Sequence, residues 1–292
     1  MSNGRMALAL PLLLGLTLSQ APAPAPAPTS PSWKSLADGV EYATFRLPRG
    51  GSGGDGVLHV VRVSPDQAEL KAILASEHGK EKRTAGSWAE QFQLTVAINA
   101  GMFAMDHSSN VGYLRNGSHL NQSRWSPKYQ SVLAFGGGGE GAPAAAMFDL
   151  DAPGARESLA SYRTVIQNLR LVKASEQGGG ENVWKSGPRQ WSEAAVAADG
   201  EGHILFLFSR TPMAMHHFNE YILGLPLGIV RAMHAEGGPE ASLSIRAPGL
   251  SLDLSGSYET GFNENDDNSS QWPIPNVIGV VAKKAKGPAK AR

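Results

Sequence analysis

The chain has 292 residues, of which 41% are hydrophobic and 18% are charged, with 34 glycines, 19 prolines and no cysteine. This composition predicts one globular domain rich in turns, and it excludes disulfides and a lipid anchor on cysteine. Lysine plus arginine and aspartate plus glutamate balance at 26 each. Because no overall field attracts a polyanion, we do not expect nucleic acid or an anionic membrane surface as a partner.

The N-terminus predicts a signal peptide over residues 1–21. Arg5 supplies a positive charge, residues 7–18 are mostly apolar, and small residues follow. The apolar stretch is shorter than the roughly 20 residues that span a bilayer. We therefore expect a secreted or periplasmic protein with no stable membrane insertion after processing.

Three further parts follow along the chain. Residues 22–38 form a linker that begins with alternating alanine and proline, a composition that favours an extended polyproline II spacer. Residues 39–282 contain the apolar segments of a folded domain. Residues 283–292 carry lysine and arginine without apolar periodicity, which predicts a solvated tail.

The domain is predicted to be strand-rich. Short apolar or alternating segments are separated by clusters of glycine, proline, asparagine and aspartate, which is typical of strands and turns. We expect a single α+β domain, a mixed curved sheet with a few helices packed on it. The predicted strands are residues 40–45, 57–63, 70–75, 95–99, 131–135, 147–150, 164–168, 194–198, 204–208, 229–233, 242–245 and 277–281.

Two helices are predicted from apolar periodicity. The first covers residues 84–92, with Ala85, Trp88 and Phe92 on one face. The second is predicted to start at Thr211 as N-cap, with Pro212 in its first turn. It continues through apolar residues at helical spacing, namely Met215, Phe218, Ile222 and Leu225.

Two of the predicted strands end on polar residues followed by glycine. The apolar run from Ile229 ends at Glu236, which Gly237 and Gly238 follow. The run at residues 94–98 ends similarly at Asn99. A strand that ends on a carboxylate and then turns sharply on glycines is one way in which folds present an acid to a pocket. An ordinary strand–turn junction remains an equally good interpretation of this local pattern.

These two strand ends resemble signatures of the phosphodiester glycosidase family. Residues 99–103 (Asn-Ala-Gly-Met-Phe) are similar to its Asn-Gly-Gly-Phe-Phe motif, and residues 235–242 to its Leu-Asp-Gly-Gly-Gly-Ser-Ser motif. Further segments follow in the family's order, at residues 111–117, 166–169, 189, 194–197 and 273–280, so the resemblance extends over residues 39–281. The sequence departs from the family pattern at Glu236, where the family has aspartate, and at Pro239, Glu240 and Ala241, which replace a pair of small hydroxyl residues.

The resemblance implies a hydrolase that cleaves a sugar phosphodiester at the anomeric carbon, with a carbohydrate or glycan-phosphate substrate. We expect no cofactor and assign no metal ligand from the sequence, which leaves the metal requirement open. Glu236 is then the carboxylate that stabilises or attacks the oxocarbenium-like carbon. Arg189 neutralises the departing phosphate, which a planar guanidinium binds through two hydrogen bonds, and Glu240 is a second acid. The expected substrate-binding residues are Asn99, Gly101, Phe103, Asn168, Gly237 and Gly238.

Two other functions stay open. A non-catalytic envelope module that binds polysaccharide or peptidoglycan is suggested by the departures around Glu240. A glycosidase acting on an ordinary glycan is the other alternative. Turnover of a sugar phosphodiester separates the first function from the binding module, and a requirement for the phosphate separates it from the ordinary glycosidase.

The remaining motifs have simpler explanations. Residues 51–56 match a dinucleotide-binding glycine pattern but precede a predicted strand, so we expect a hairpin or loop. His216 and His217 are adjacent in the second helix and point in different directions, so we expect no shared zinc ion. His119 and His234 are candidates for proton transfer near neutral pH, although a structural histidine is the commoner case.

Overall fold

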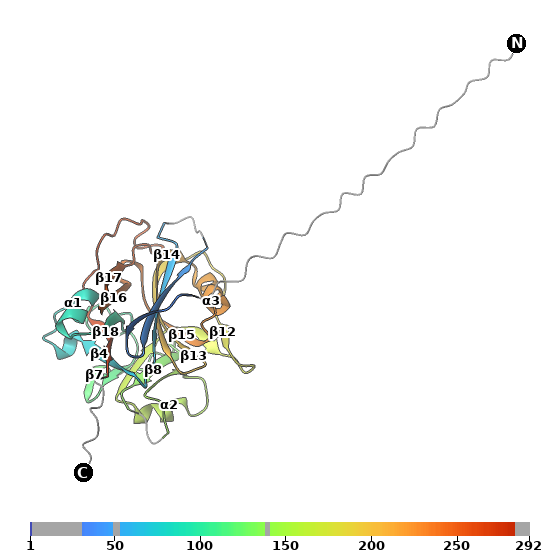
Figure 1. Ribbon diagram of the computed structural model, residues 1–292. Helices are drawn as coiled ribbons and strands as arrows, with labels where there is room; N and C mark the ends of the chain where they lie inside the picture. The colour runs from blue at the N-terminus through green and yellow to red at the C-terminus, as the bar shows by residue number, and fades with distance from the viewer. Residues whose placement is uncertain (2–30, 49–52, 138–140, 284–292) are drawn as a thin grey trace.

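A computed structural model of the chain describes residues 1, 31–48, 53–137 and 141–283 (Figure 1). The predicted signal peptide after Met1, the linker up to residue 30 and the basic tail from residue 284 lie outside the described residues. The first strand begins at Lys34, five residues before the predicted start of the domain. The end of the predicted linker is therefore part of the fold.

The largest sheet has eight strands, with β13 and β15 near its middle. Residues 192–198 of β13 are all buried, as expected of a central strand covered on both faces. In spatial order the sheet consists of β1 (Lys34–Ala37), β2 (Val40–Arg46), β3 (Val57–Val63), β14 (Ile204–Met213), β13 (Trp191–Asp199), β15 (Ile229–Gly237), β11 (Arg170–Ala174) and β12 (Gly180–Asn182).

Two five-stranded sheets complete the strand framework. The first has the order β7 (His119–Gln122), β6 (Leu114–Asn116), β10 (Thr164–Asn168), β8 (Ser131–Phe135) and β9 (Ala145–Asp149). The second has the order β17 (Leu250–Ser255), β16 (Ser242–Ala247), β5 (Val96–Asn99), β18 (Asn276–Ala282) and β4 (Ala68–Leu74). The strand-rich α+β single domain is confirmed. However, the described strands form three sheets and not one mixed sheet, and neighbouring strands within each sheet pair antiparallel.

One hydrophobic core joins the three sheets. The large sheet contributes Val196 and Phe206, the first small sheet Ile166, and the second small sheet Ile98 and Leu243, all of them fully buried. Burying such a side chain stabilises a fold by about 1.5–3 kcal/mol. The shared core explains why the three sheets form a single body.

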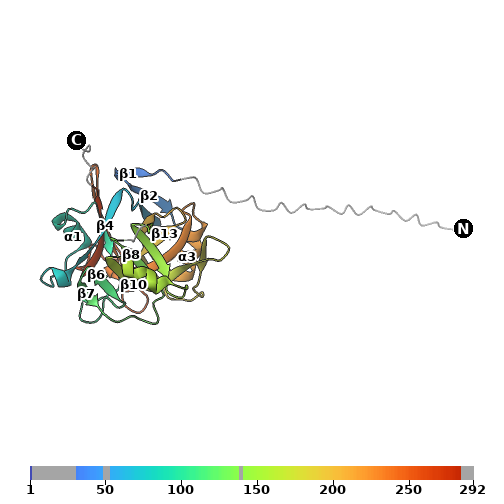
Figure 2. The same ribbon diagram turned by 90° about the horizontal axis from the view of Figure 1, so that it is seen from below.

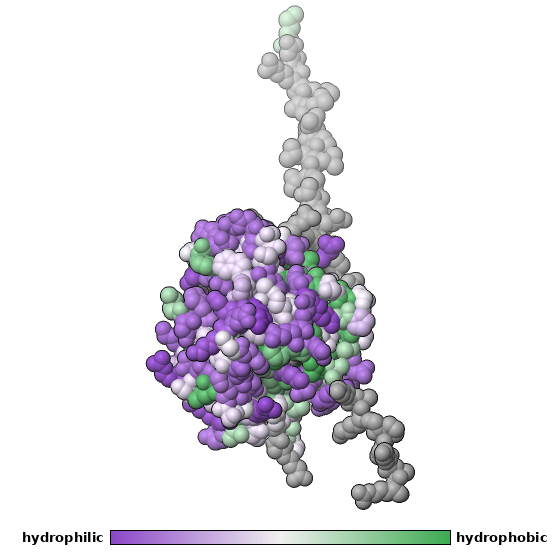
Figure 3. All heavy atoms as spheres, turned by 90° about the vertical axis from the view of Figure 1, so that its left-hand side faces the viewer, coloured by the Kyte–Doolittle hydropathy of each residue, from purple (hydrophilic) through white to green (hydrophobic). Residues whose placement is uncertain are grey.

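Helices α1 (Ala85–Gln91) and α3 (Met215–Gly224) cover outer faces of the sheets on opposite sides of the molecule (Figures 1 and 2). Trp88 of α1 packs on the second small sheet, and Phe218 of α3 on the large sheet. The side of the molecule that carries α1 is predominantly hydrophilic (Figure 3), because the apolar face of this helix is turned inward. The other helical turns are α2 (Ala155–Ser158) and the 3₁₀ segments η1 (Ala75–Glu77), η2 (Leu159–Ser161) and η3 (Gly238–Glu240).

The first predicted helix is confirmed, and the structure shows Thr84 as its N-cap. The Thr84 hydroxyl accepts a hydrogen bond from the Ser87 N–H at 3.1 Å, which satisfies one of the free donors of the first turn. The predicted start of the second helix is wrong. Thr211 and Pro212 belong to β14, and the N-cap is Ala214, which makes no side-chain bond. The Thr211 hydroxyl instead accepts the Gly56 N–H at 2.7 Å, a partner 155 residues away.

Each of the twelve predicted strand segments overlaps a strand of the structure, but six strands were not predicted. β1, β6, β7, β11 and β12 have three to five residues, too few for a clear period. β17 alternates leucine with polar residues, so this strand was recognisable from its pattern. The described end of the glycine pattern, residues 53–56, lies in the connection between the paired strands β2 and β3, which confirms the predicted hairpin loop.

Among the described residues, no helix is long and apolar enough to cross a membrane.

Candidate active site

A cavity of about 450 Å³ opens where the ends of β13, β15 and α3 meet. Glu236 and Gly237 line it from β15, Arg189 from the segment before β13, and Met215 from the first turn of α3. The lining also includes residues that were not predicted to belong to the site, among them Met102, Trp184, Trp191 and Glu259. The structure thus brings Glu236 and Arg189 together although 46 residues separate them in the sequence.

An irregularity in β15 lies on one side of the cavity. Ala194 of β13 is opposite Glu236, whereas the next residue, Ala195, is opposite His234. Ala235 therefore has no partner on β13, which is the pattern of a β-bulge. His234 and Glu236 both line the cavity, so the bulge lies at the point where β15 delivers its two titratable side chains.

The environment of Glu236 favours its protonated form. Burial raises the pKa of its carboxyl group to about 8, and the nearby carboxyl groups of Glu240 and Glu259 contribute in the same direction. His234 and the Gly237 N–H, which donates to Glu236 Oε1 at 3.1 Å, act in the opposite direction but do not outweigh burial. At neutral pH this glutamic acid therefore carries a proton that it can donate.

A buried histidine–glutamate pair joins β15 to β13 beside the cavity. His234 Nδ1 lies 2.8 Å from Glu193 Oε1, and Trp191 Nε1 donates to Glu193 Oε2 at 2.6 Å. Burial opposes a charged His234 ring, but the Glu193 carboxylate outweighs burial and raises the pKa of His234. We did not predict a role for Glu193. An acid next to the apolar run of residues 194–198 in the strand Trp191–Asp199 is the sequence signal that identifies it.

Arg189 and Glu259 form the more open rim of the cavity. Arg189 Nη2 lies 3.9 Å from Glu259 Oε1, and the arginine side chain is 68% exposed. Because this contact is long and the arginine is exposed, the guanidinium is available to an anionic ligand.

The two glycines after Glu236 make close packing possible. A Cβ atom on Gly237 would lie 2.8 Å from Trp191 Cδ1, and one on Gly238 would lie 2.6 Å from Glu259 Oε2. Gly238 also has a φ of +61°, which side chains rarely adopt. The glycines therefore allow Trp191 and Glu259 to approach the end of β15.

The amide of Asn99 is used inside the protein. Its Nδ2 donates to the Glu240 carbonyl at 3.0 Å, and its Oδ1 accepts the Ser242 N–H at 2.7 Å. Both ends of the side chain thus hold the η3 turn that follows Glu236. Asn99 does not line the cavity, and its expected role in sugar binding stays a prediction.

Asn168 and Gly101 form a second internal contact. Asn168 Nδ2 donates to the Ala100 carbonyl at 2.8 Å. A Cβ on Gly101 would lie 2.4 Å from Asn168 Oδ1, so this position requires glycine. These two residues fix the chain that leads from β5 to Met102, which lines the cavity.

The last two predicted site residues also lie beside the cavity and do not line it. Phe103 packs against the hydrophobic cluster that contains Trp88 of α1, and its ring centroid lies 5.9 Å from that of His107. Glu240 is half-buried, and burial raises the pKa of its carboxyl group. Its own backbone N–H and Lys82 lower this pKa, whereas the charge of Glu259 raises it, but burial is the largest effect. It acts on the site through the electrostatic field at Glu236.

Two groups of possible metal ligands occur among the described residues. One consists of His216, His217 and Glu220, and the other of Asp199, Glu201 and His203. None of the six lines the cavity.

The fold and the cavity define a strand-rich α+β domain with a pocket suited to acid–base chemistry on an anionic ligand. A family model described as phosphodiester glycosidase matches residues 92–281. The chain belongs to the phosphodiester glycosidase family, as its motifs indicate.

Solved structures share the fold at low sequence identity. The catalytic domain of zebrafish N-acetylglucosamine-1-phosphodiester alpha-N-acetylglucosaminidase, auto-inhibited by its pro-peptide, is 12% identical with a TM-score of 0.56, over 86% of this chain and 88% of that one. A hypothetical protein from Synechocystis is 14% identical with a TM-score of 0.52, over 84% of this chain and 62% of that one. At these identities the comparison shows the fold alone. No curated protein matches the chain in sequence.

Proposed function

We propose that this protein hydrolyses the bond between the anomeric carbon and a phosphate oxygen in a sugar phosphodiester. The observation that carries this proposal is the shared cavity of Glu236, whose raised pKa suits a proton donor, and Arg189, an accessible guanidinium that suits a phosphate. Membership of the phosphodiester glycosidase family supports the same substrate class.

The raised pKa of Glu236 favours a role as proton donor. As the bond from the anomeric carbon to oxygen breaks, protonated Glu236 gives its proton to the phosphate oxygen, while the bonding electrons leave with that oxygen. Water then attacks the carbon, and the resulting Glu236 carboxylate takes a proton from it. This role differs from the ionised carboxylate that the sequence suggested. Glu259 provides a second carboxyl group in the cavity.

Two tryptophans supply an apolar surface for a sugar ring. Trp184 and Trp191 line the cavity and meet edge to face, with ring centroids 6.1 Å apart. The hydrogen bond from Trp191 Nε1 to Glu193 fixes the orientation of that indole. Rigid aromatic rings bury a large area with little loss of side-chain entropy, which suits them to position the sugar.

Arg189→Lys is expected to be severe for a phosphodiester substrate and mild for the same sugar on a phosphate-free leaving group. A compact ammonium does not reproduce the two parallel hydrogen bonds of a guanidinium to phosphate. We expect a loss in kcat/KM of roughly 10-fold to 100-fold on the phosphodiester, which corresponds to about 1.4–2.8 kcal/mol. Steady-state kinetics on the two substrates measure this difference. Equal losses of kcat/KM on both substrates would show that Arg189 has a structural role at the rim and does not bind the phosphate.

The predicted signal peptide extends the proposal to export. We propose that the protein is secreted or periplasmic and that residues before about Ala21 are absent from its mature form. The charged, apolar and small-residue order of residues 1–21 supports this. Mass spectrometry of protein recovered from the envelope or medium gives the mature N-terminus. An intact Met1 in the exported fraction would contradict cleavage.

A further inference from the structure

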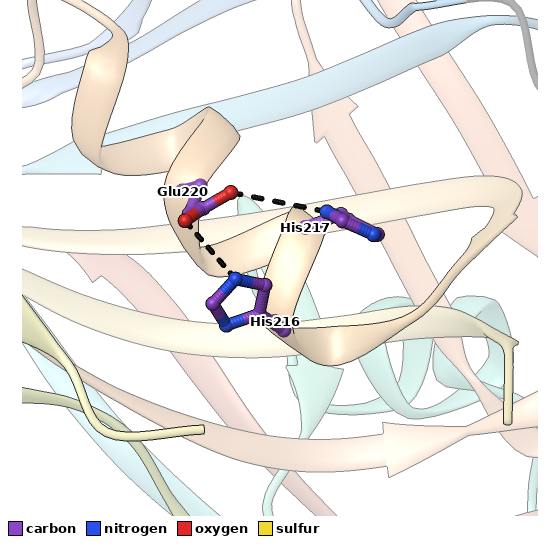
Figure 4. Close-up of side chains that lie close together, drawn as sticks. All are labelled: His216, His217 and Glu220. Carbon is purple, nitrogen blue, oxygen red and sulfur yellow. Dashed lines mark ion pairs between the residues drawn. The ribbon is translucent and has the colours of Figure 1, made fainter. Parts of the chain in front are cut away.

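We propose that His216, His217 and Glu220 at the start of α3 form a binding site for a divalent transition-metal ion, with Zn²⁺ as the probe. Figure 4 shows the Glu220 carboxylate paired with both imidazole rings. His216 Nε2 lies 3.0 Å from Glu220 Oε1, and His217 Nδ1 lies 3.8 Å from Glu220 Oε2. The three ligand atoms lie within 4.8 Å of one another. This convergence differs from the sequence-based expectation that adjacent histidines do not share an ion.

The hydrogen bonds of His216 determine which ring nitrogen is available. Nδ1 lies 2.7 Å from the Trp184 carbonyl oxygen. A carbonyl only accepts, so Nδ1 carries the proton and donates it. The Asn182 amide nitrogen, 3.1 Å from Nδ1, has its own acceptor in the His216 carbonyl at 3.0 Å. In the neutral ring, Nε2 therefore presents a lone pair toward Glu220.

This arrangement places two acceptors against each other. The lone pair of His216 Nε2 and the carboxylate of Glu220 face each other at 3.0 Å, and their contact becomes favourable when a positive charge lies between them. A second proton on the ring or a metal ion supplies that charge. Metal-binding histidines commonly donate their other ring N–H to a backbone carbonyl, as His216 donates to Trp184.

The donor atoms indicate the class of metal. Two imidazole nitrogens and one carboxylate oxygen suit Zn²⁺, Co²⁺, Ni²⁺ or Cu²⁺, whereas Mg²⁺ and Ca²⁺ prefer oxygen ligands throughout. The side chains of His217 and Glu220 are 60% and 57% exposed. Solvent therefore reaches the site, and water can complete the coordination of an ion.

The second candidate cluster serves as a comparison because its contacts are satisfied without a cation. His203 Nδ1 lies 2.7 Å from Asp199 Oδ2, so its N–H donates directly to the carboxylate. Asp199 Oδ1 accepts the backbone N–H groups of Glu201 and His203 at 3.0 and 2.8 Å. Glu201 Oε2 lies 3.7 Å from the same Nδ1, so this N–H donor already faces both carboxylates of the cluster.

An ion on α3 would also act on the wall of the cavity. His216 Nδ1 donates to the carbonyl of Trp184. Trp184 and Met215, the residue before His216, both line the cavity. A metal on Nε2 polarises the ring and strengthens the Nδ1–H donor. Metal binding would therefore hold the Trp184 segment more firmly.

The test uses untagged full-length protein freed of metal by EDTA and dialysed. Calorimetric titration with ZnCl₂ is expected to show one ion per chain, and Co²⁺ is expected to give the visible absorption of a nitrogen- and oxygen-ligated ion. His217→Asn and Glu220→Gln change exposed side chains, and each is expected to weaken Zn²⁺ binding at least 10-fold. The matched control His203→Asn is expected to bind Zn²⁺ as the unaltered protein does.

Several results would overturn the site. Absence of stoichiometric Zn²⁺ binding would do so, as would unchanged affinity in both His217→Asn and Glu220→Gln. Loss of binding in His203→Asn alone would move the ion to the other cluster. Thermal unfolding with and without Zn²⁺ provides a readout that is independent of catalysis, because an ion that binds only the folded state raises Tm.

Discussion

Glu236→Gln is expected to lower kcat on a sugar phosphodiester by about 10²-fold to 10⁴-fold, the usual contribution of a positioned acid–base group. The amide keeps the shape of the side chain but does not donate or accept the transferred proton. Its folding should be unaffected, because the acid is protonated and uncharged near neutral pH in the native site. Steady-state kinetics, with circular dichroism as a check on folding, measure the effect.

The pH dependence and a control variant distinguish the role of Glu236. Since the protonated form acts, kcat/KM should fall as pH rises through about 8, and this limb should be absent in Glu236→Gln. A rate that rises through the same range would assign Glu236 as an ionised nucleophile. The control is Glu240→Gln, which removes a charge beside the site, and it should retain most of the activity. An unaltered protein that binds such glycans without turnover would instead support the binding module.

Glu193→Ala is expected to destabilise the fold by about 3–5 kcal/mol, the usual effect of leaving one member of a buried ion pair without its partner. Glu193 and His234 are both buried and lie 2.8 Å apart. Without the Glu193 carboxylate, the buried His234 imidazole has no charged partner. Trp191 Nε1, which donates to Glu193, also loses its hydrogen-bond acceptor. Urea unfolding followed by fluorescence gives the change in free energy of unfolding.

Two further variants complete the test of this pair. Glu181→Ala, at an exposed position on β12, should change stability by no more than about 0.5 kcal/mol. The double variant Glu193→Ala/His234→Ala should lose less stability than the sum of the single variants, because each single change leaves a buried group unpaired. Additive losses would show that the two side chains do not stabilise one another.

Local features of the sequence predicted much of the strand and helix content. Thr84 caps α1 through a bond to a residue three positions away, so a short window contains all the required information. The same holds for the end of β15, where an apolar run, an acid and two glycines follow one another. The order of the family motifs added the substrate class and placed Glu236 and Arg189 in one hypothesis.

Distant contacts decided the parts that were wrong or missing. Thr211 has the pattern of a helix cap, but its hydroxyl meets the Gly56 N–H, and the chain there stays extended. Short strands such as β6 and β12 exist because neighbouring strands supply their hydrogen-bond partners. A window of the sequence does not contain those partners.

The same distinction separates the residues of the candidate site. Sequence alone identified Glu236 as an acid at a strand end, because chain order and glycine turns are local properties. Only the tertiary structure showed that Asn99 uses both ends of its amide to hold the η3 turn. Only the tertiary structure joined His234 to Glu193. The pKa of Glu236 likewise depends on burial and on the charge of Glu259, and both arise when strands far apart in the sequence pack around one cavity.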